Sequence, residues 1–596
     1  MLFRSLSVAL FLFSSASSFA LASGSEAFAA TVESILHRMK AEKTPEELMR
    51  FRPRDVAEFL NAEERKVLGE AYLSFDVNVR SVVSVWWPAK QRDMPFWLEE
   101  QGFAPVEKQL TLEELRFQAW EKSVEPGRVG LGYSSLDGEG DHYFVTVSPA
   151  ESGATLEVGN VDPRKHTVGT LEDGARIYTD DPDSQLASVP AALVGQVLVR
   201  SPEKRARESM LVGKWRSTSH PSHVRPDHVV LTWSEDPTTT QTVQWRAAKE
   251  VTGGQVRFRR AGAAGEEQLI GAEQSAIEDK LLINDPVCHR FTATMRGLEP
   301  DTEYEYQVGH GPEGHWTEWT SFRTAPAEAK PFRFVYMGDA QNGLDQWGRL
   351  LKSCFEKHPE AHFYIMAGDL VNRGHDRDDW DDLFHNAEGV YDRRTLVPAV
   401  GNHEMSGGEG LPQMYLDLFD LPDNGSPEIA TERSYAFHYS NALFIVLDTN
   451  ANPREQTAWL EEQLANTTAK WKFVVYHHPA YASAPGRDNF ALRREWTPLF
   501  DKYHVDLALQ GHDHAYLRTY PMNNDKRVAE AKDGTIYIVS VSGTKFYDQE
   551  PRDYTEFGMT KTATFQLLDI AIEDNKLIYH AYDIDGVSKD TFVIEK

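Results

Sequence analysis

The stretch Gly338-Asp339-Ala340-Gln341 comes directly after the apolar run Phe332–Met337, and it is the first of five polar motifs that each follow such a run. A short apolar run predicts a buried strand, and α/β sheets place their ligands beyond the carboxyl ends of their strands. The other runs and motifs are Phe363–Ala367 with Gly368-Asp369-Leu370-Val371-Asn372, Thr395–Val400 with Gly401-Asn402-His403-Glu404, Phe473–Tyr476 with Tyr476-His477-His478-Pro479, and Val505–Gln510 with Gly511-His512-Asp513-His514. Because all five supply carboxylate, amide or imidazole donors, they predict a metal cluster that performs hydrolysis.

On these residues the chain resembles the calcineurin-like metallophosphoesterases and, within them, the purple acid phosphatase branch. The resemblance covers roughly residues 221–596. It implies an α/β fold, with a four-layer αββα sandwich over residues 331–596. An all-β domain of fibronectin type III character is expected over residues 221–326, as in plant-type members. Residues 23–205 lie outside the resemblance and are expected to form an α+β accessory region of helices followed by a small β unit.

The resemblance also implies a ligand set and a mechanism. Two divalent or trivalent ions, drawn from iron, zinc or manganese, would hold a bridging hydroxide that attacks the phosphate ester. The ligands carried over are Asp369 as the bridge, Asp339 and His514 on the first metal, and Asn402, His477 and His512 on the second. His477 is preferred to His478 because the family pattern is His-x-Pro.

Two positions depart from the family pattern. Purple enzymes have a tyrosinate three residues after the bridging Asp, and this chain has Asn372 there, so we expect a colourless enzyme. Many other members of the superfamily carry a His in the first motif where this chain has Gln341. Either amide could supply an oxygen to the first metal, and the sequence leaves that choice open.

Substrate contacts are expected from His403 and Arg487. His403 follows a metal-binding Asn and would protonate the leaving oxygen, with Glu404 orienting its ring. Plant purple enzymes place two histidines after the His-x-Pro motif, whereas this chain offers Arg487, which could clamp phosphate or be an ordinary surface charge. The acidic stretch Asp376–Asp382 is expected to solvate a helix start rather than to bind metal.

Local patterns predict the other elements. Leu298-x-Pro300-x-Thr302-x-Tyr304 resembles the tyrosine corner of a fibronectin-type sandwich. Helices are expected at Gln456–Leu464 and Leu492–Lys502, and three C-terminal strands, Ala563–Ile572, Leu577–Asp583 and Thr591–Ile594, are expected to complete the second sheet of the αββα sandwich.

Residues 26–124 look helical, with three capping signals, and short β-like runs such as Tyr143–Val147 and Gln196–Val199 follow over 127–200. The capping signals are Thr44-Pro45-Glu46-Glu47, Asn61-Ala62-Glu63-Glu64 and Thr111-Leu112-Glu113-Glu114.

Composition restricts the partners and the compartment. A formal net charge of −29 disfavours nucleic acid and anionic membranes, since both bind basic surfaces. Arg4, the apolar stretch Val8–Phe13 and Ala20-Leu21-Ala22 are typical of a signal peptide over residues 1–22, which predicts a secreted or periplasmic protein without a membrane span. The two cysteines, Cys288 and Cys354, fall in different predicted domains and are expected to be buried free thiols.

The sequence therefore favours an exported phosphomonoesterase that acts on a small phosphorylated substrate; it does not indicate an oligomeric state. A phosphodiesterase is the near alternative, because the same cluster cleaves both ester types. A non-catalytic surface-binding protein is the alternative of another class. It is disfavoured because all six carried-over ligand positions are filled.

Overall fold

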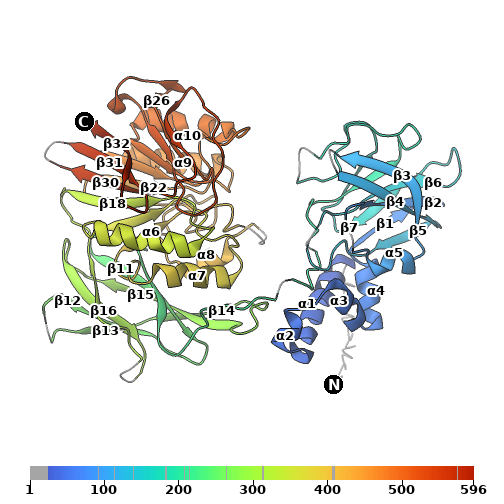
Figure 1. Ribbon diagram of the computed structural model, residues 1–596, viewed down its shortest axis with the longest axis horizontal. Helices are drawn as coiled ribbons and strands as arrows, with labels where there is room; N and C mark the ends of the chain where they lie inside the picture. Colours follow the sequence, from blue (N-terminus) through green and yellow to red (C-terminus); the bar gives the residue numbers. More distant parts are fainter. Residues whose placement is uncertain are drawn as a thin grey trace, which may run out of the picture. The chain divides into compact units, whose positions relative to one another are not determined.

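The computed structural model describes residues 24–596, apart from 92, 113–114, 139, 181–183, 207, 214, 264, 312–314, 406–409 and 573–574. The chain divides into two compact units, Met1–Trp215 and Arg216–Lys596 (Figure 1). The expected signal peptide lies outside the described residues. Among the residues described, no helix is both long enough and apolar enough to cross a membrane.

The first unit begins with four helices: α1 (Gly24–Glu42), α2 (Pro45–Leu48), α3 (Pro53–Phe59) and α4 (Ala62–Glu70). Two of the predicted caps are confirmed. Thr44 and Asn61 each form a capping box with the glutamate three residues later, which satisfies backbone N–H groups that a helix leaves free.

The prediction of helical structure up to Val124 is wrong beyond residue 70, apart from one short helix at residues 96–100. Strands β1 (Leu73–Val77) and β2 (Ser81–Pro88) come next, then α5 (Phe96–Glu100) and the paired strands β3 (Ala104–Leu112) and β4 (Leu115–Val124). The predicted cap at Thr111 lies at the end of β3, where Thr111 pairs with Arg116 of β4. A cap signal reads only four residues, and here strand pairing over two longer segments overrides it.

The remaining strands of this unit are β5 (Gly127–Leu131), β6 (Phe144–Pro149), β7 (Val158–Asp162), β8 (Thr167–Thr170) and β9 (Val197–Arg200). Together with β1–β4 they form a six-stranded sheet, β3-β4-β2-β6-β9-β8, and a three-stranded sheet, β5-β1-β7. The β part of the unit is therefore larger than the sequence predicted. Its core contains Trp86, Phe117 and Phe144, and the rings of Trp86 and Phe144 stack at 5.8 Å.

The second unit opens with the expected β-sandwich. One sheet has the order β10 (Asp227–Thr232), β11 (Thr240–Ala248), β15 (Val287–Arg296), β14 (Glu273–Glu278), and the other β13 (Gln268–Gly271), β12 (Gln255–Arg260), β16 (Glu303–Gly309), β17 (Thr320–Arg323). The predicted tyrosine corner is confirmed, because the Tyr304 hydroxyl accepts a hydrogen bond from the Glu299 N–H at 2.9 Å.

Two sheets form the centre of the domain that follows. The first has the order β20 (Thr395–Pro398), β19 (Phe363–Met366), β18 (Phe332–Met337), β30 (Phe565–Ala571), β31 (Lys576–Tyr582), β32 (Ser588–Glu595). The second has the order β21 (Tyr435–Tyr439), β22 (Ala442–Val446), β23 (Trp471–Val475), β24 (Leu507–Gln510), β28 (Ile536–Val539), β25 (Tyr516–Thr519), β29 (Thr555–Met559). Phe334, Phe363, Phe444 and Phe473 pack ring against ring between them.

Helices cover both sheets, which gives the expected four layers. Buried residues of α6 (Leu344–Lys357) and α7 (Arg377–Ala387) join the core of the first sheet, and those of α9 (Arg454–Asn466) and α10 (Phe490–Tyr503) pack on the second. The smaller elements are α8 (Gln413–Leu418), β26 (Met522–Asn523), β27 (Lys526–Arg527) and the 3₁₀ turn Ala531–Asp533.

The three C-terminal strands form as predicted but join the first sheet. β30 pairs antiparallel with β18. They therefore extend the sheet that carries the first motif, and do not complete the second sheet.

The acidic stretch Asp376–Asp382 does not simply solvate a helix start. The Asp381 carboxylate is buried and lies 2.7 Å from the Arg246 guanidinium of the β-sandwich. Burial raises the pKa of Asp381 to about 6, while Arg246 opposes that shift. These carboxylates connect α7 to the neighbouring domain, which lies beside it in Figure 1. Cys288 and Cys354 are free and buried, as predicted.

Candidate metal centre

The five motifs lie in loops that immediately follow strands β18, β19, β20, β23 and β24. β18, β19 and β20 run parallel, and so do β23 and β24, so their loops emerge at the same edge of each sheet. Glycine allows two of these loops to meet, since a Cβ on Gly401 would lie 2.2 Å from the Asp369 nitrogen and one on Gly511 would lie 2.5 Å from Asp339 Oδ2. The predicted motifs, which are far apart in the sequence, are thus adjacent in space.

Backbone conformation at the motifs is unusual. Asp339, Asp369, His512 and His514 have positive φ angles of 27°, 50°, 74° and 45°. Such values are uncommon for residues other than glycine and are found preferentially at functional sites. The loops are therefore held in this form by the surrounding fold.

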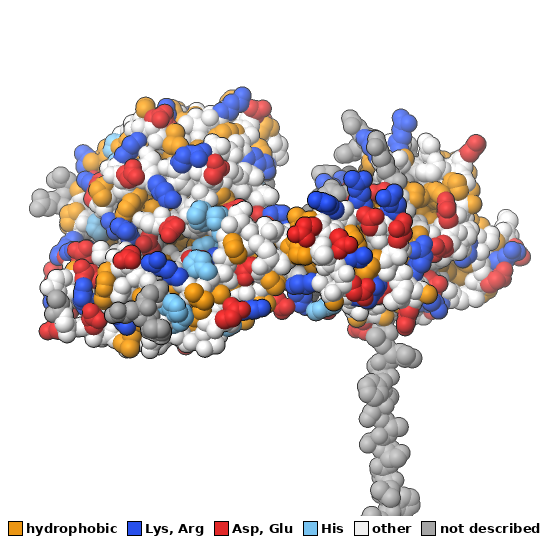
Figure 2. Space-filling model, turned by 60° about the horizontal axis from the view of Figure 1, so that its bottom comes forward, with side chains coloured by type: hydrophobic (Ala, Val, Ile, Leu, Met, Phe, Trp, Pro, Cys, Tyr) orange, Lys and Arg blue, Asp and Glu red, His pale blue; other side chains and the backbone are white. Residues whose placement is uncertain are grey.

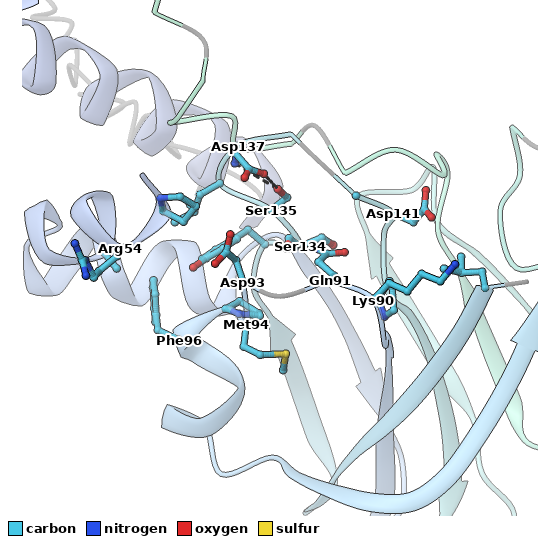
Figure 3. Close-up of a pocket in the computed structure, with 18 residues that line it drawn as sticks. Arg54, Lys90, Gln91, Asp93, Met94, Phe96, Ser134, Ser135, Asp137 and Asp141 are labelled. Carbon is cyan, nitrogen blue, oxygen red and sulfur yellow. Dashed lines mark hydrogen bonds between the residues drawn. The ribbon is translucent and has the colours of Figure 1, made fainter. Parts of the chain in front are cut away.

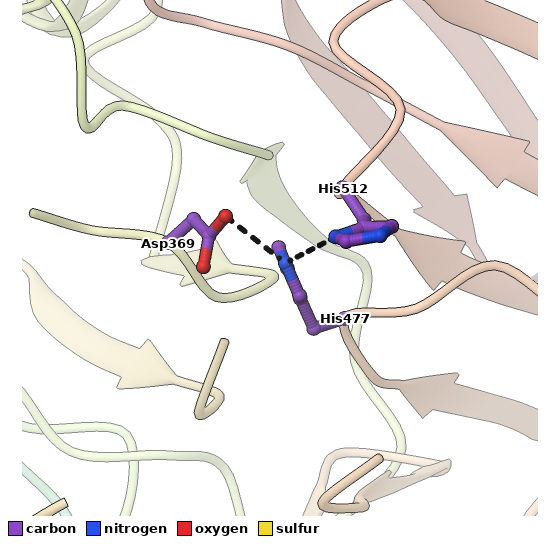
Figure 4. A group of neighbouring side chains, drawn as sticks. All are labelled: Asp369, His477 and His512. Atoms are coloured by element: carbon purple, nitrogen blue, oxygen red, sulfur yellow. Dashed lines mark hydrogen bonds and ion pairs between the residues drawn. The ribbon is translucent and has the colours of Figure 1, made fainter. Parts of the chain in front are cut away.

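Three of the other predicted ligands converge on His477. Its Nε2 lies 3.1 Å from Asp369 Oδ2 and 3.2 Å from His512 Nδ1 (Figure 4). It also lies 3.1 Å from Asn402 Oδ1. Asn402 Oδ1 also lies 2.9 Å from His512 Nδ1. The other nitrogen of His477 faces the Ala367 carbonyl at 2.9 Å, which fixes the ring with Nε2 toward the cluster.

A second group shares Asp369. Asp339, Asp369 and His514 each offer a ligand atom within 4.8 Å of the others, as do Asp369, His477 and His512. His514 Nε2 lies 3.7 Å from Asp339 Oδ1. The structure therefore arranges the carried-over ligands as two sets with Asp369 common to both.

The donor set fits two cations. Asp339 Oδ1 is buried and has no hydrogen-bond partner within the described part of the chain, and Asn402 Oδ1 and the imidazole nitrogens turn lone pairs toward one another. Burial raises the pKa of Asp339, and the neighbouring Asp369 raises it further. Burial disfavours a charged His477, yet the two carboxylates raise its pKa to about 10. The cluster thus attracts positive charge, which metal ions would supply.

The other histidines of the cluster are neutral. Burial lowers the pKa of His512, and it lowers the pKa of His514 to about 4. A neutral imidazole offers the lone pair that a metal requires. Histidine side chains gather on one face of the second unit, among charges of both signs (Figure 2).

Glu404 has a different role from the one predicted. The sequence suggested that it orients the His403 ring; the structure shows its buried carboxylate accepting backbone N–H groups from Gly401 at 2.7 Å, Asp369 at 2.8 Å and Leu370 at 2.8 Å. It therefore ties the two loops that carry Asp369 and Asn402. Burial, together with the Asp369 charge, raises the pKa of Glu404 to about 7.

The His403 ring is held by two residues that the sequence analysis discussed only as possible ligands. Its Nδ1 lies 2.6 Å from the Asn372 carbonyl, and its Nε2 lies 3.1 Å from Gln341 Nε2. The Gln341 oxygen is buried with no hydrogen-bond partner among the described residues, so it remains available to the first metal. The His403 N–H also donates to Asp369 Oδ1 at 2.9 Å, which places the ring beside the bridge.

Arg487 and His478 border the cluster. Arg487 Nη1 lies 2.7 Å from Asp513 Oδ1 and donates to the His512 carbonyl at 3.1 Å, so part of its hydrogen-bonding capacity is used within the protein. His478 lies outside both ligand groups, and its Nδ1 is 2.7 Å from the Thr449 hydroxyl. Sequence reasoning missed Thr449, although Asp448-Thr449-Asn450 follows the apolar strand β22 in the same pattern as the five motifs.

The first unit holds a buried polar network of its own. His142 Nδ1 lies 2.8 Å from the Ser134 hydroxyl, and Nε2 lies 3.4 Å from the Tyr72 hydroxyl and 3.3 Å from Glu208 Oε2. Burial lowers the pKa of His142 to about 4 and raises that of Glu208 to about 7. None of these residues was predicted from the sequence to be functional.

Next to this network is a hollow of about 620 Å³. Figure 3 shows side chains of mixed character around it, among them Arg54, Lys90, Asp93 and Phe96. Neither sign of charge dominates its lining, and no metal-ligand group is found there among the described residues.

Comparison with known proteins agrees with the fold and the site. Residues 332–516 match the model of the calcineurin-like phosphoesterase family, and residues 226–324 match that of the purple acid phosphatase N-terminal domain. An uncharacterized protein of Mycobacterium tuberculosis is 29% identical over 333 residues, which cover 49% of this chain and 62% of the relative. The chain thus spans less than two thirds of that relative's length.

Two further relatives belong to plants. The Fe(3+)-Zn(2+) purple acid phosphatase 12 of Arabidopsis thaliana is 28% identical over 247 residues, which cover 38% of this chain and 51% of the relative. The solved structure of purple acid phosphatase PPD1 from yellow lupin seeds aligns with a TM-score of 0.55 at 16% identity, covering 89% of this chain and 94% of that one, which supports the fold.

The αββα fold, the ligand loops and these matches define a calcineurin-like metallophosphoesterase. The segment that matches the purple acid phosphatase N-terminal domain precedes the segment that matches the phosphoesterase domain, so over these residues the chain is purple acid phosphatase-like.

Proposed function

We propose that this chain is an exported phosphatase that hydrolyses phosphate monoesters at a centre of two metal ions. The observation that carries the proposal is the convergence of two ligand groups on one shared carboxylate, Asp369. Two ions, when bound, would activate the phosphoryl group as Lewis acids and lower the pKa of water. Asp339 and His514 would hold one ion and Asn402, His477 and His512 the other.

His403 is the proposed proton donor. A carbonyl only accepts, so the contact of 2.6 Å with Asn372 assigns a hydrogen to Nδ1, and Nε2, which lies 3.1 Å from the Gln341 amide nitrogen, would exchange that neighbour for the leaving oxygen of the substrate. In hydrolysis the ester bond between phosphorus and the leaving oxygen breaks, water supplies the new oxygen on phosphorus, and the leaving oxygen takes a proton from His403.

The metals are proposed to be iron, zinc or manganese, and the enzyme to be colourless. The relative named as an Fe(3+)-Zn(2+) enzyme supports iron and zinc. Asn372 has no phenolate to give a ferric charge-transfer band. Export is supported by Arg4, Val8–Phe13 and Ala20-Leu21-Ala22, and sequencing the N-terminus of the protein from a host's medium or periplasm tests it.

Turnover of p-nitrophenyl phosphate and bis-p-nitrophenyl phosphate tests the proposal, after the protein has been reconstituted with Fe, Zn or Mn. We expect about two metal ions per chain and a preference for the monoester. A preference for the diester would favour the phosphodiesterase. Metal binding without turnover of either ester would favour a non-catalytic role.

A further inference from the structure

A hollow of about 670 Å³ opens beside the metal centre, within the second unit. Its walls come from the loops after β18 and β19, from the start of α6, from α7, and from the segment before the β-sandwich. The lining residues are Ser219, His220, Gln341, Asn342, Gly343, Leu344, Asp345, Asn372, Arg373, Asp379, Asp382, His385 and Asn386. Gln341 and Asn372 also contact the His403 ring, so the hollow adjoins the proposed proton donor.

The position of the hollow relates it to the leaving group. A proton donor must lie within hydrogen-bond reach of the leaving oxygen. With the phosphate at the metal ions, the leaving oxygen would face His403. The remainder of the substrate then extends past Gln341 and Asn372, which open into the hollow.

The only guanidinium in the lining is already neutralised. Arg373 lies 2.6 Å from Asp379, 3.2 Å from Asp376 and 3.2 Å from Asp378. Asp345, which pairs with Arg349 at 3.2 Å, and Asp382 add carboxylates whose side chains are 67% and 51% accessible. A leaving group that carries its own phosphate or carboxylate would therefore meet net negative charge.

Amides and imidazoles make up most of the remaining wall. Asn342 and Asn386 supply amide groups, and the Asn342 oxygen is buried with no hydrogen-bond partner among the described residues. His220 stacks on His385 with ring centroids 3.8 Å apart, and its Nε2 lies 3.4 Å from Asp382 Oδ1. Of the residues that line the hollow, Leu344 alone has a hydrophobic side chain, and the lining is more polar than apolar, so an alkyl or aryl group would find fewer apolar contacts than in a hydrophobic pocket.

We propose that this hollow binds the leaving group and selects uncharged polyhydroxylated alcohols, so that the preferred substrates are phosphate monoesters of sugars and other polyols. Hydroxyl groups both donate and accept, and they match a wall of carboxylates, amides and imidazoles. A site built to bond hydroxyls discriminates against analogues that lack them. The inference rests on the proposed phosphatase function and names its substrate class.

Three substrates with alkoxide leaving groups test it on the metal-loaded protein. Glucose 6-phosphate is expected to show a kcat/KM about tenfold above those of n-hexyl phosphate and 3-phosphoglycerate. Turnover of p-nitrophenyl phosphate is measured alongside. If no phosphate ester is hydrolysed, the proposed function fails; if esters are hydrolysed but the polyol ester is not preferred, this inference alone fails.

Reversing a charge in the hollow tests whether the preference for polyol esters arises there. Asp382→Lys should lower the ratio of kcat/KM for glucose 6-phosphate over 3-phosphoglycerate about tenfold, since it removes an acceptor and adds a positive charge. Asp417→Lys, on the exposed face of α8, makes the same change of charge outside the hollow and is the matched control. An equal change in both variants, or none in Asp382→Lys, overturns the assignment.

Binding of the free alcohol gives a readout that needs no turnover. Saturation-transfer NMR of the full chain with sorbitol should show contact that Asp382→Lys weakens and Asp417→Lys preserves. Equal signals from sorbitol and n-hexanol would contradict selection for hydroxyl groups.

Discussion

The His142 ring in the first unit and the His477 ring in the second are both buried beside carboxylates, but their neighbours differ in kind. Around His142, a hydroxyl faces each ring nitrogen, from Ser134 at 2.8 Å and from Tyr72 at 3.4 Å. A hydroxyl can donate or accept as its neighbour requires. Around His477, the facing atoms are Asp369 Oδ2, Asn402 Oδ1 and His512 Nδ1, which are acceptors or lone-pair donors.

The pKa shifts follow the same division. In the first unit, burial raises the pKa of Glu208 to about 7 and lowers that of His142 to about 4, so both groups tend toward neutrality. In the second, the carboxylates raise the pKa of His477 to about 10, against the effect of burial. The comparison shows that buried histidine and carboxylate alone do not mark a metal site. Lone pairs of carboxylate, amide and imidazole groups that converge on one point do.

Asp369→Asn should have the largest effect on metal binding and turnover. Two cations a few ångströms apart need their shared anion to offset mutual repulsion, so metal content should fall below two ions per chain and phosphatase turnover should be lost. Elemental analysis and a p-nitrophenyl phosphate assay measure both. Glu208→Gln, a matched change in the other buried cluster, should keep both ions and full turnover. Two bound ions in Asp369→Asn would contradict the bridge assignment.

His403→Ala should separate proton transfer from metal binding. Turnover is expected to fall roughly 10²-fold, the usual contribution of a positioned proton donor, and more for alkyl than for p-nitrophenyl phosphate, whose leaving group departs without a proton. Metal content should stay at the wild-type level, because Asn402 is the proposed ligand of that motif. Loss of metal would instead make His403 a ligand.

Glu404→Gln should produce a smaller loss. The amide keeps one acceptor oxygen of the two that now bind the Gly401, Asp369 and Leu370 N–H groups, so the two loops should loosen. Metal affinity is expected to fall about 10- to 100-fold, as for other groups that position ligands. Competition with a chelator measures it. Glu432→Gln is the control, since Glu432 also accepts a backbone N–H, from Leu421, but outside the centre.

Glu208→Gln should change how the stability of the first unit depends on pH. A carboxyl whose folded pKa is raised from 4.5 to about 7 loses stabilisation as pH rises through that interval, whereas a histidine lowered from 6.5 to about 4 gains it. In the wild type the two trends oppose each other. The variant keeps only the second, so calorimetry should show the first unit's transition rising more steeply between pH 4 and 6.5 than in the wild type. Parallel profiles would mean that Glu208 is ionised in the folded chain.

The ligand loops were predictable because each lies directly behind a strand, where the apolar run and the polar motif adjoin in sequence. Asp339 and His512 needed no knowledge of long-range contacts to be found. The roles of Glu404 and Asp381 did need it. Glu404 acts on the backbone of a loop more than thirty residues away, and Asp381 pairs with Arg246 of another domain. Thr111 carried a helix-cap signal, yet the pairing of β3 with β4 decided its structure.

The pairing of β18 with β30 has a consequence for how the chain acquires its structure. β18 (Phe332–Met337) delivers Asp339, but its antiparallel partner β30 (Phe565–Ala571) is made only after every other motif has been synthesised. Contacts so distant in sequence slow folding, because a long loop must close before they form. On the ribosome, the first sheet therefore has an unpaired edge at β18 until the last strands emerge. Chaperones that bind exposed strand edges would act mainly during that interval.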